Sequence, residues 1–594
     1  MSVLESGLVK DAGCRYVAAV DSVPAFAIPA TLFGSLAARL DRLGPVKEIA
    51  QIGAAIGREF PHQLLADVVP ASVNSLNAGL AQLAATELIS VHGEPPDATY
   101  TFKHALVQDA AYATLSRRNR QHVHRRISDA LEKNFPDLIG TRPELLAYHL
   151  AEAGLIPRAV DYLRKAGQRA IQHSANTEAI GHLNNALELL RSLPAGSEHA
   201  HMALDLEVLL AQALIASRGY AAPETKKTLL RAKTLIDDRT DPAKTISVLY
   251  GVWAGHYVSG EAAKQRQVAI EFLAEAERHK DTGARCIAHR VFGSTCLVRG
   301  EFDAGLRHLE QARALFDHEQ HARFRFQYGQ DIGTAASCYM SWALWHLGQV
   351  EQAAKVADEA IRRAESLSHP HTYVYTLCHA RGFIDIFKGQ WEEMESYARV
   401  IVSLCAEHGL FHWMNCGRIF EGWAAICGGD LHSGMETLQR GVAGWRKAGA
   451  KLWLPIFSMM EAEAYSKAGR NDDALQAVDR AIAVSADTGE RWALAEVLRV
   501  KARLLQSMGL APVREVETLL VRSLNTARRQ RAHCWELRAS CDLARLWQEE
   551  GRMEEATQLL QVTYDKFTEG FDTIDLRDAK SLMAHGSREH SIQL

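Results

Sequence analysis

The feature that most constrains the fold of this chain is a glycine that recurs about every 40 residues. The glycines placed to close one helix and start a turn are Gly219, Gly260, Gly300, Gly348, Gly389, Gly429, Gly469, Gly509 and Gly551. A fixed period of this length is typical of stacked helix pairs, because each pair can bury its apolar face only against its neighbours. The spacing therefore predicts an all-α solenoid over most of the 594 residues.

The residues that follow each glycine share a second pattern. Counted from Gly300, positions +2, +5, +9 and +12 are Phe302, Gly305, Leu309 and Ala312. The last three positions share one face of a helix, so small or aliphatic side chains there let the second helix of a pair approach the first closely. The pattern also follows Gly154, Gly348, Gly389, Gly429, Gly469 and Gly551. The units after Gly219, Gly260 and Gly509 fit poorly, the last because "GLAPVREVETLL" carries two extra residues.

This pattern resembles the tetratricopeptide repeat in a longer form of about 40 residues. The resemblance covers roughly residues 147–584 and implies a long concave surface that binds proteins or peptides. All eleven tryptophans fall between Trp253 and Trp547. Two interpretations of them stay open: they fill gaps between helices, or some of them line a peptide groove. We expect residues 585–594 to form a disordered tail.

The region before the array has a different organisation. Apolar residues at helical spacing, with Pro45 and Gly57 as start and stop signals, predict two helices between Leu32 and Gly57. Two short helices are predicted at 63–68 and 73–85. Two β-prone runs, Leu88 to His92 and Thr99 to Phe102, then flank a turn rich in Gly, Pro and Asp.

Compact helices followed by one β-hairpin are typical of a winged-helix domain, which we place at residues 24–115. A strand-poor segment at 1–23 precedes it, and a helical linker at 116–146 connects it to the repeats.

His104 is the candidate site residue. It stands where the second strand of the hairpin meets a predicted helix that begins at Ala105. Positive partial charge and free N–H groups collect at a helix N-terminus, so backbone and imidazole together could hold an anion such as a nucleotide phosphate. The alternative is a structural histidine that caps the helix or packs against the hairpin.

Two segments carry a more specific resemblance. "IPATLFGSLAARLDRLGPVKEIAQIGAAIGREF" and "YTFKHALVQDAAYATL" resemble the winged-helix end of bacterial signalling proteins that join a class III adenylate/guanylate cyclase, an AAA/STAND-type ATPase and tetratricopeptide repeats. The tail "YDKFTEGFDTIDLRDAKSLM" resembles the C-terminal signature of that family. In related ATPases a winged-helix histidine at this junction contacts the nucleotide phosphates, a role that the resemblance places on His104. This chain has His-Ala where many relatives have His-Asp.

The catalytic parts of that family are absent from the sequence. No G-x-x-x-x-G-K-[ST] run could form a phosphate-binding loop, and no α/β region could form a cyclase domain. H-E-x-x-H and G-x-S-x-G are absent as well. We therefore expect a non-enzymatic regulatory and protein-interaction module without cofactor or metal, which binds proteins, peptides or a cyclase/ATPase module in cis or in trans.

Two alternatives stay open. The chain belongs to an ATP-binding cyclase-type enzyme whose true start lies upstream, or it is a winged-helix regulator that binds DNA. Arg117, Arg118, Arg120, Arg125 and Arg126 could contact DNA phosphates, although a solvated helix face or docking against an ATPase domain is the favoured interpretation.

The composition of the chain limits which partners and which cell compartment we expect. The net charge of -4 gives no global basic footprint, so nucleic acid is not the expected partner. The N-terminus lacks the features of a secretory signal, and no unbroken apolar run approaches the length of a membrane span. The ten cysteines are scattered without C-x-x-C, which indicates reduced thiols and a cytoplasmic protein.

Overall fold

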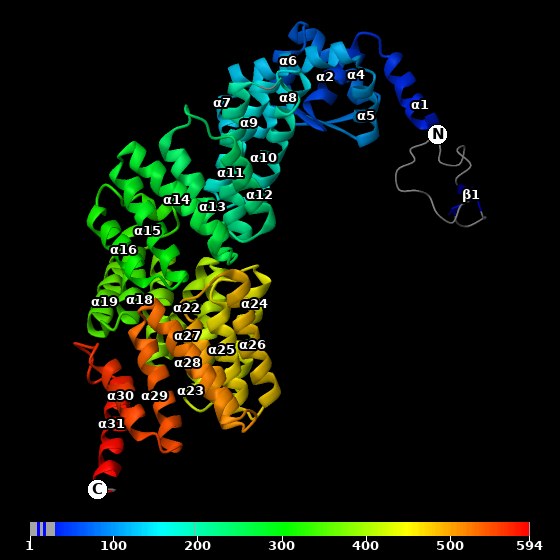
Figure 1. Ribbon diagram of the computed structural model, residues 1–594. Coiled ribbons are helices and arrows are strands. Elements are labelled where there is room, and N and C mark those ends of the chain that lie inside the picture. Colours follow the sequence, from blue (N-terminus) through cyan, green and yellow to red (C-terminus); the bar gives the residue numbers. More distant parts are fainter. Residues whose placement is uncertain (1–8, 12–15, 19–29, 195, 593–594) are drawn as a thin grey trace. The chain divides into compact units, whose positions relative to one another are not determined.

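The computed structural model describes residues 9–11, 16–18, 30–194 and 196–592. The chain forms two compact units, residues 1–213 (unit 1) and 214–594 (unit 2). Apart from two small sheets, the described residues fold into helices (Figure 1). The predicted all-α fold class is confirmed.

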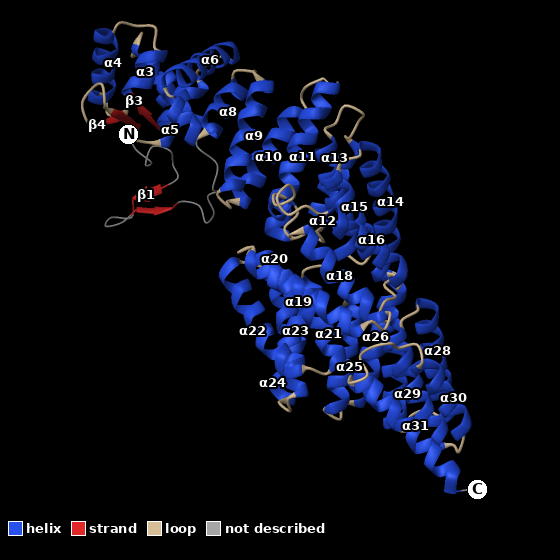
Figure 2. Cartoon of the chain, turned by 90° about the vertical axis from the view of Figure 1, so that its left-hand side faces the viewer, coloured by secondary structure: helices blue, strands red, loops and turns tan. Residues whose placement is uncertain are grey.

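Unit 1 contains all the strands of the described chain (Figure 2). Two three-residue strands pair within the predicted segment 1–23, whose other residues lie outside the described ones. The elements up to the hairpin are β1 (Val9–Asp11), β2 (Tyr16–Ala18), α1 (Ala30–Asp41), α2 (Val46–Ile56), β3 (Glu59–Pro61), α3 (His62–Val68), α4 (Val73–Ala85), β4 (Ile89–His92) and β5 (Thr99–Phe102).

The strand β3 was not predicted. It pairs antiparallel with β5, with Phe60 opposite Tyr100, so that β5 becomes the central strand of a three-stranded sheet. Three residues that end in proline are too short to show an alternating pattern. Phe60 is fully buried, and its ring lies so close to α2 that a methyl group on Gly53 would come within 2.9 Å of it.

Seven helices complete unit 1: α5 (Ala105–Ala113), α6 (Arg117–Asn134), α7 (Pro136–Thr141), α8 (Pro143–Glu152), α9 (Ile156–Gln172), α10 (Asn176–Leu190) and α11 (Ser197–Arg218), which continues into unit 2. A continuous apolar core extends from Leu40 in α1 to Ala159 in α9. The sheet region and the first repeat helices therefore share one core.

By length and composition, α11 is apolar enough to cross a membrane, which the sequence pattern did not indicate. In the structure, 44% of its most apolar window is buried inside the protein. A packed helix of a repeat array has the same composition, so this single helix is weak support for a membrane span.

Unit 2 is an array of helices joined by short turns. They are α12 (Pro223–Thr234), α13 (Pro242–Val258), α14 (Ala262–His279), α15 (Thr282–Val298), α16 (Phe302–Leu315), α17 (Phe324–Gln327), α18 (Ile332–His346), α19 (Val350–Ser366), α20 (Pro370–Thr376), the π-helical turn η2 (Leu377–Gly382), α21 (Phe383–Lys388), α22 (Trp391–His408), α23 (Phe411–Cys427), α24 (Leu431–Lys447), α25 (Leu454–Lys467), α26 (Asn471–Thr488), α27 (Leu494–Ser507), α28 (Val513–Gln530), α29 (His533–Glu549), α30 (Met553–Tyr564) and α31 (Ile574–Ile592). Helix α31 continues to residue 592, whereas the sequence predicts disorder from residue 585.

The glycine register is confirmed in this array. The second helix of a pair begins two residues after the turn glycine in most units, as α16 does after Gly300, whereas α12 begins at Pro223, four residues after Gly219. After Gly509 it begins at Val513, which accommodates the two extra residues of that turn. Positions +5, +9 and +12 are buried in the units that carry the pattern. At the closest approach, a methyl group on Gly422 in α23 would lie 2.4 Å from the backbone nitrogen of Leu438 in α24.

Successive turns of the array contact one another through their helix ends. The Val298 carbonyl, at the end of α15, accepts hydrogen bonds from the backbone N–H groups of Arg491 (2.8 Å) and Trp492 (3.2 Å), just before α27. The Val258 carbonyl at the end of α13 does the same for Lys451 (2.9 Å) and Leu452 (3.2 Å). Helix ends leave backbone groups without intrahelical partners, and here those groups satisfy each other. We call these contacts the turn-to-turn ladder.

Tryptophan side chains fill the interior of unit 2 between the turns that the ladder joins. Trp342 lies 5.1 Å from Trp492 and 5.8 Å from Trp453 between ring centroids, and Trp345 lies 4.8 Å from Trp535. Eight of the eleven tryptophans are buried and three are half-buried. The interpretation that they fill gaps between helices is therefore confirmed for those eight.

Glu490 is a carboxyl group inside this aromatic core. It is 2% exposed, and it accepts hydrogen bonds from the Trp453 backbone N–H (3.0 Å) and from Trp492 Nε1 (2.6 Å). Burial raises the pKa of Glu490 to about 7, because the charged form loses its hydration.

Glu490→Gln should reduce the pH dependence of unfolding between about pH 4.5 and 7. Since the folded pKa lies above the ordinary value of 4.5, the protonated carboxyl favours the fold, and this stability is lost as the pH rises through the folded pKa. A shift of this size corresponds to roughly 3 kcal/mol. Urea unfolding near pH 5 and pH 7.5 should show wild type losing more stability than the variant, and equal losses would contradict the assignment.

Candidate interaction surfaces

At the C-terminal end of the array the contact between turns is looser. The turn at Gly389 faces α31, where a methyl group on Gly389 would lie 3.7 Å from Ile574 Cδ1. Among the described residues, no backbone hydrogen bond joins this turn to α31. Two cavities of about 520 Å³ and 370 Å³ adjoin here, and Lys388, Gly389, Ile574 and Asp575 line both. We call the two cavities together the C-terminal groove.

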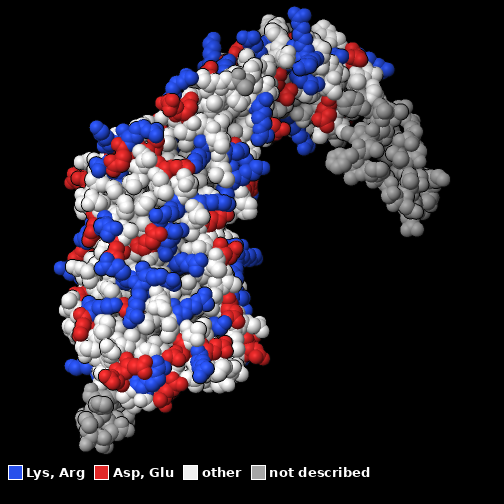
Figure 3. All heavy atoms as spheres, viewed as in Figure 1, with Lys and Arg blue, Asp and Glu red and all other residues white. Residues whose placement is uncertain are grey.

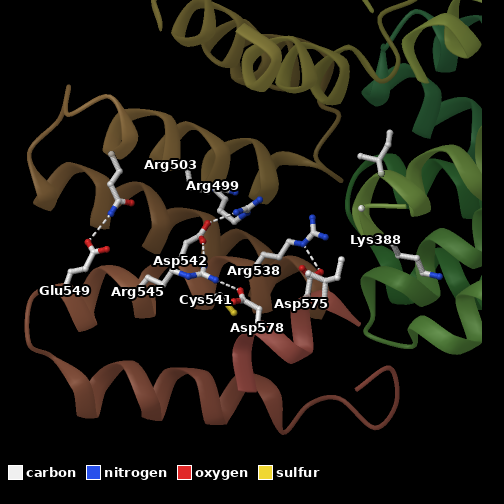
Figure 4. Close-up of a pocket in the computed structure, with 14 residues that line it drawn as sticks. Lys388, Arg499, Arg503, Arg538, Cys541, Asp542, Arg545, Glu549, Asp575 and Asp578 are labelled. Atoms are coloured by element: carbon white, nitrogen blue, oxygen red, sulfur yellow. Dashed lines mark hydrogen bonds and ion pairs between the residues drawn. The ribbon is translucent and has the colours of Figure 1, made fainter. Parts of the chain in front are cut away.

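The two halves of the C-terminal groove differ in chemistry. The smaller cavity has an apolar floor that includes Trp345, Leu537 and Phe567. The larger cavity is charged and is lined from α21, α27, α29 and α31 (Figure 4). Its charged residues are Lys388, Arg499, Arg503, Arg538, Arg545, Asp542, Glu549, Asp575 and Asp578.

Most of these charges are paired with one another. Arg499 makes two hydrogen bonds of 2.8 Å to Glu496 and one of 2.5 Å to Asp542. Arg538 donates to Glu496 (3.1 Å) and to Asp575 (2.9 Å), so that the network joins α27, α29 and α31 (Figure 4). Burial alone would raise the pKa of Glu496, but Arg499 and Arg538 lower it to about 2. The carboxylate is therefore ionised at neutral pH.

Arg499→Ala should destabilise the protein by about 3–5 kcal/mol, because it leaves Glu496 buried with half of its counter-charge. Arg503 provides a matched control: it lies one turn farther along α27, is exposed and forms no ion pair among the described residues. Arg503→Ala should change the free energy of unfolding by less than about 0.5 kcal/mol. Equal effects of the two substitutions in urea unfolding would contradict the network as described.

His104 lies where the sequence places it. It is the N-cap residue of α5, directly after β5, and its side chain is exposed and makes no capping hydrogen bond. The capping alternative is therefore wrong in this structure. The imidazole lies beside the N-terminal end of α5, with no hydrogen-bond partner among the described residues.

The described residues give little support for a metal site or a reactive cysteine. Within the described part of the chain, no three His, Cys, Asp or Glu side chains come together as a metal site would require. The described cysteines are free and nearly all buried. Burial raises the pKa of thiols such as Cys286 and Cys296 to about 12, which disfavours the reactive thiolate.

The C-terminal groove was not predicted from the sequence. Its residues come from segments that are up to about 230 residues apart, and each segment alone has the pattern of an ordinary helix or helix end. Only the folded arrangement places Lys388, Arg538 and Asp575 around one cavity. In the sequence, the alternating charges along α29 are the feature that relates to the groove, but such alternation is common on solvated helices and does not indicate a site.

Comparisons with known proteins give limited similarity. No family model matches the chain. An uncharacterized protein of Rhizobium meliloti (strain 1021) is 24% identical over 483 residues, which cover 80% of this chain and 46% of that protein. The chain thus spans about half the length of this curated relative.

Three solved structures illustrate the structural similarity. Rap protein complexed with competence and sporulation factor is 10% identical, with 72% of this chain and 99% of that chain covered and a TM-score of 0.35. The Cut9–Hcn1 hetero-tetramer of APC/C is 10% identical, with 81% of this chain and 92% of that chain covered and a TM-score of 0.41. Yeast Tom70 is 11% identical, with 77% of this chain and 97% of that chain covered and a TM-score of 0.31.

Proposed function

We propose that this chain is a non-catalytic regulatory and protein-interaction module of a cyclase/ATPase-type signal-transduction protein, acting in the cytoplasm. The C-terminal groove is the observation that supports this proposal most directly. It combines an apolar floor with charged groups at its edge, as sites that bind peptide segments do.

The packing of unit 2 indicates where a partner docks. Buried tryptophans occupy the space inside the ladder, so a peptide has no room there. In the C-terminal groove, by contrast, a partner can place an apolar side chain over Trp345 and Phe567. Lys388 and Arg503 then lie near the larger cavity to pair with acidic groups of the partner.

The N-terminal region has a role of its own in this proposal. We assign residues 24–115 as a winged-helix domain, and His104 as a contact to the phosphates of a nucleotide held by an ATPase module in cis or in trans. The exposed imidazole at the N-terminal end of α5 supports this role. The length of the Rhizobium meliloti relative is compatible with further modules joined to such an array.

The enzyme alternative makes a different prediction. If the chain belongs to an ATP-binding cyclase-type enzyme, the DNA upstream of Met1 should continue in frame and encode G-x-x-x-x-G-K-[ST].

The DNA-binding alternative has less support. A helix that enters a groove of DNA needs cations for the phosphates, yet α4, the helix before the hairpin, contains no Lys or Arg. The turn between β4 and β5 carries Glu94 and Asp97, which would repel phosphates.

Binding to the part of the Rhizobium meliloti relative that this chain does not cover tests the proposal. We expect a complex by titration calorimetry, weakened at least about 10-fold by Ile574→Asp, which places a charge in the groove. Val562→Asp is the control, because Val562 is similarly exposed (53% against 59% for Ile574) and does not line the groove. Turnover of ATP by the chain alone, or equal weakening by both variants, would contradict the proposal.

The same complex tests His104. His104→Ala should weaken ADP or ATP binding by the complex, whereas His92→Ala, which alters an exposed histidine at the end of β4, should leave it unchanged. Unchanged nucleotide affinity in both variants would remove His104 from the phosphate-contacting role.

A further inference from the structure

Helix α6 in unit 1 presents an exposed face of arginines. Its first ten residues, "RRNRQHVHRR", contain five arginines and no acidic residue. Arg117, Arg118 and Arg125 are exposed. Arg118 and Arg125 follow Arg117 by one and eight positions, so the three side chains lie within a sector of about 100° around the helix axis. Figure 3 shows Lys and Arg side chains over the part of unit 1 that contains α6. We call these three residues the α6 arginine face.

The helix is held in place by its opposite side. Val123, Ile127 and Leu131 are buried in the core of unit 1. The Ser116 side chain accepts a hydrogen bond from the Asn119 N–H (3.3 Å) and fixes the start of the helix. The arginine face is therefore displayed on a rigid element.

The arginines of this face have no acidic partner among the described residues. A second arginine cluster shows the contrast: in unit 2, Arg528 pairs with Glu536 (2.9 Å) and Arg531 pairs with Asp303 (3.0 Å). Arg117, Arg118 and Arg125 form no such pair among the described residues, and the first acidic residue of α6 is Asp129, one turn after Arg125.

The position of the charge also disfavours the helix itself. The N-terminus of a helix carries partial positive charge, so cations in the first turns are unfavourable and an external anion is favourable. Arg117 and Arg118 stand in the first turn of α6. An acidic partner would relieve both the mutual repulsion of the arginines and the unfavourable interaction with the helix dipole.

We propose that the α6 arginine face is a docking surface for an acidic segment of a partner protein. Eight residues separate Arg117 from Arg125, which corresponds to about 12 Å along the helix. Carboxylates two helical turns apart on a partner helix match this spacing. Each guanidinium can bind a carboxylate through two parallel hydrogen bonds. This surface is separate from the C-terminal groove and does not depend on its role.

A protein partner is favoured over nucleic acid. No exposed aromatic residue lies within α6 to stack on bases. The nearby ring of Tyr112 is covered by Arg120, whose guanidinium lies 4.4 Å from the ring centroid.

The test uses the full chain and three fluorescent probes: a helical peptide with glutamates at i, i+4 and i+8, the same peptide with glutamines, and a short DNA duplex. Anisotropy at low salt should show binding of the glutamate peptide, weakened at least about 10-fold by R117E/R118E/R125E. The control R362E/R514E/R522E changes the net charge equally at exposed arginines without ion pairs elsewhere, and it should leave binding unchanged. Circular dichroism checks that both variants fold.

Three outcomes would overturn the proposal. Equal weakening by both triple variants would show a net-charge effect only. Tighter binding of the duplex than of the glutamate peptide, lost in R117E/R118E/R125E, would assign the face to nucleic acid. Failure of the glutamate peptide to bind better than the glutamine peptide would leave the face without an acidic partner.

Discussion

The architecture of unit 2 depends on the pairing of helix ends across successive turns of the array. A helix leaves its last carbonyls and first N–H groups without internal partners, and burying them unpaired is costly. Here the end of α15 supplies the Val298 carbonyl, and the residues before α27 supply the N–H groups of Arg491 and Trp492. Since the partners lie several helix pairs apart in sequence, the array is closed by long-range as well as neighbouring contacts.

This closure decides where function can reside. Aromatic side chains fill the interior, and Trp453 even adopts a left-handed backbone conformation (φ 64°) at the centre of the cluster. Such a conformation is unfavourable for a bulky residue and persists only where the surroundings enforce it. Among the described residues the backbone hydrogen bonds of the ladder are not repeated at the turn of Gly389, and ion pairs of Arg499 and Arg538 join α27, α29 and α31 beside it. The C-terminal groove lies at this transition.

The sequence predicted those parts of the structure that are local or periodic. The glycine at each turn and the small residues at +5, +9 and +12 follow from the close approach of paired helices, so the start of α28 at Val513 could be anticipated. The position of His104 at the strand-to-helix junction followed from local pattern as well. The strand β3, the ladder and the groove could not be predicted, because they depend on contacts between segments with no shared motif. The pairing state of an arginine cluster is equally invisible in sequence: only the fold shows that Arg528 has a carboxylate and Arg117 has none.

Amide hydrogen exchange at Arg491 and Trp492 tests the closure of unit 2 most directly. N–H groups at the start of a helix normally exchange quickly, because they have no intrahelical acceptor. If the Val298 carbonyl holds them, they should exchange far more slowly than the first-turn amides of α26, which serve as the internal reference. Exchange of Arg491 and Trp492 as fast as that reference would show that the turns of the array are open, and it would contradict this account.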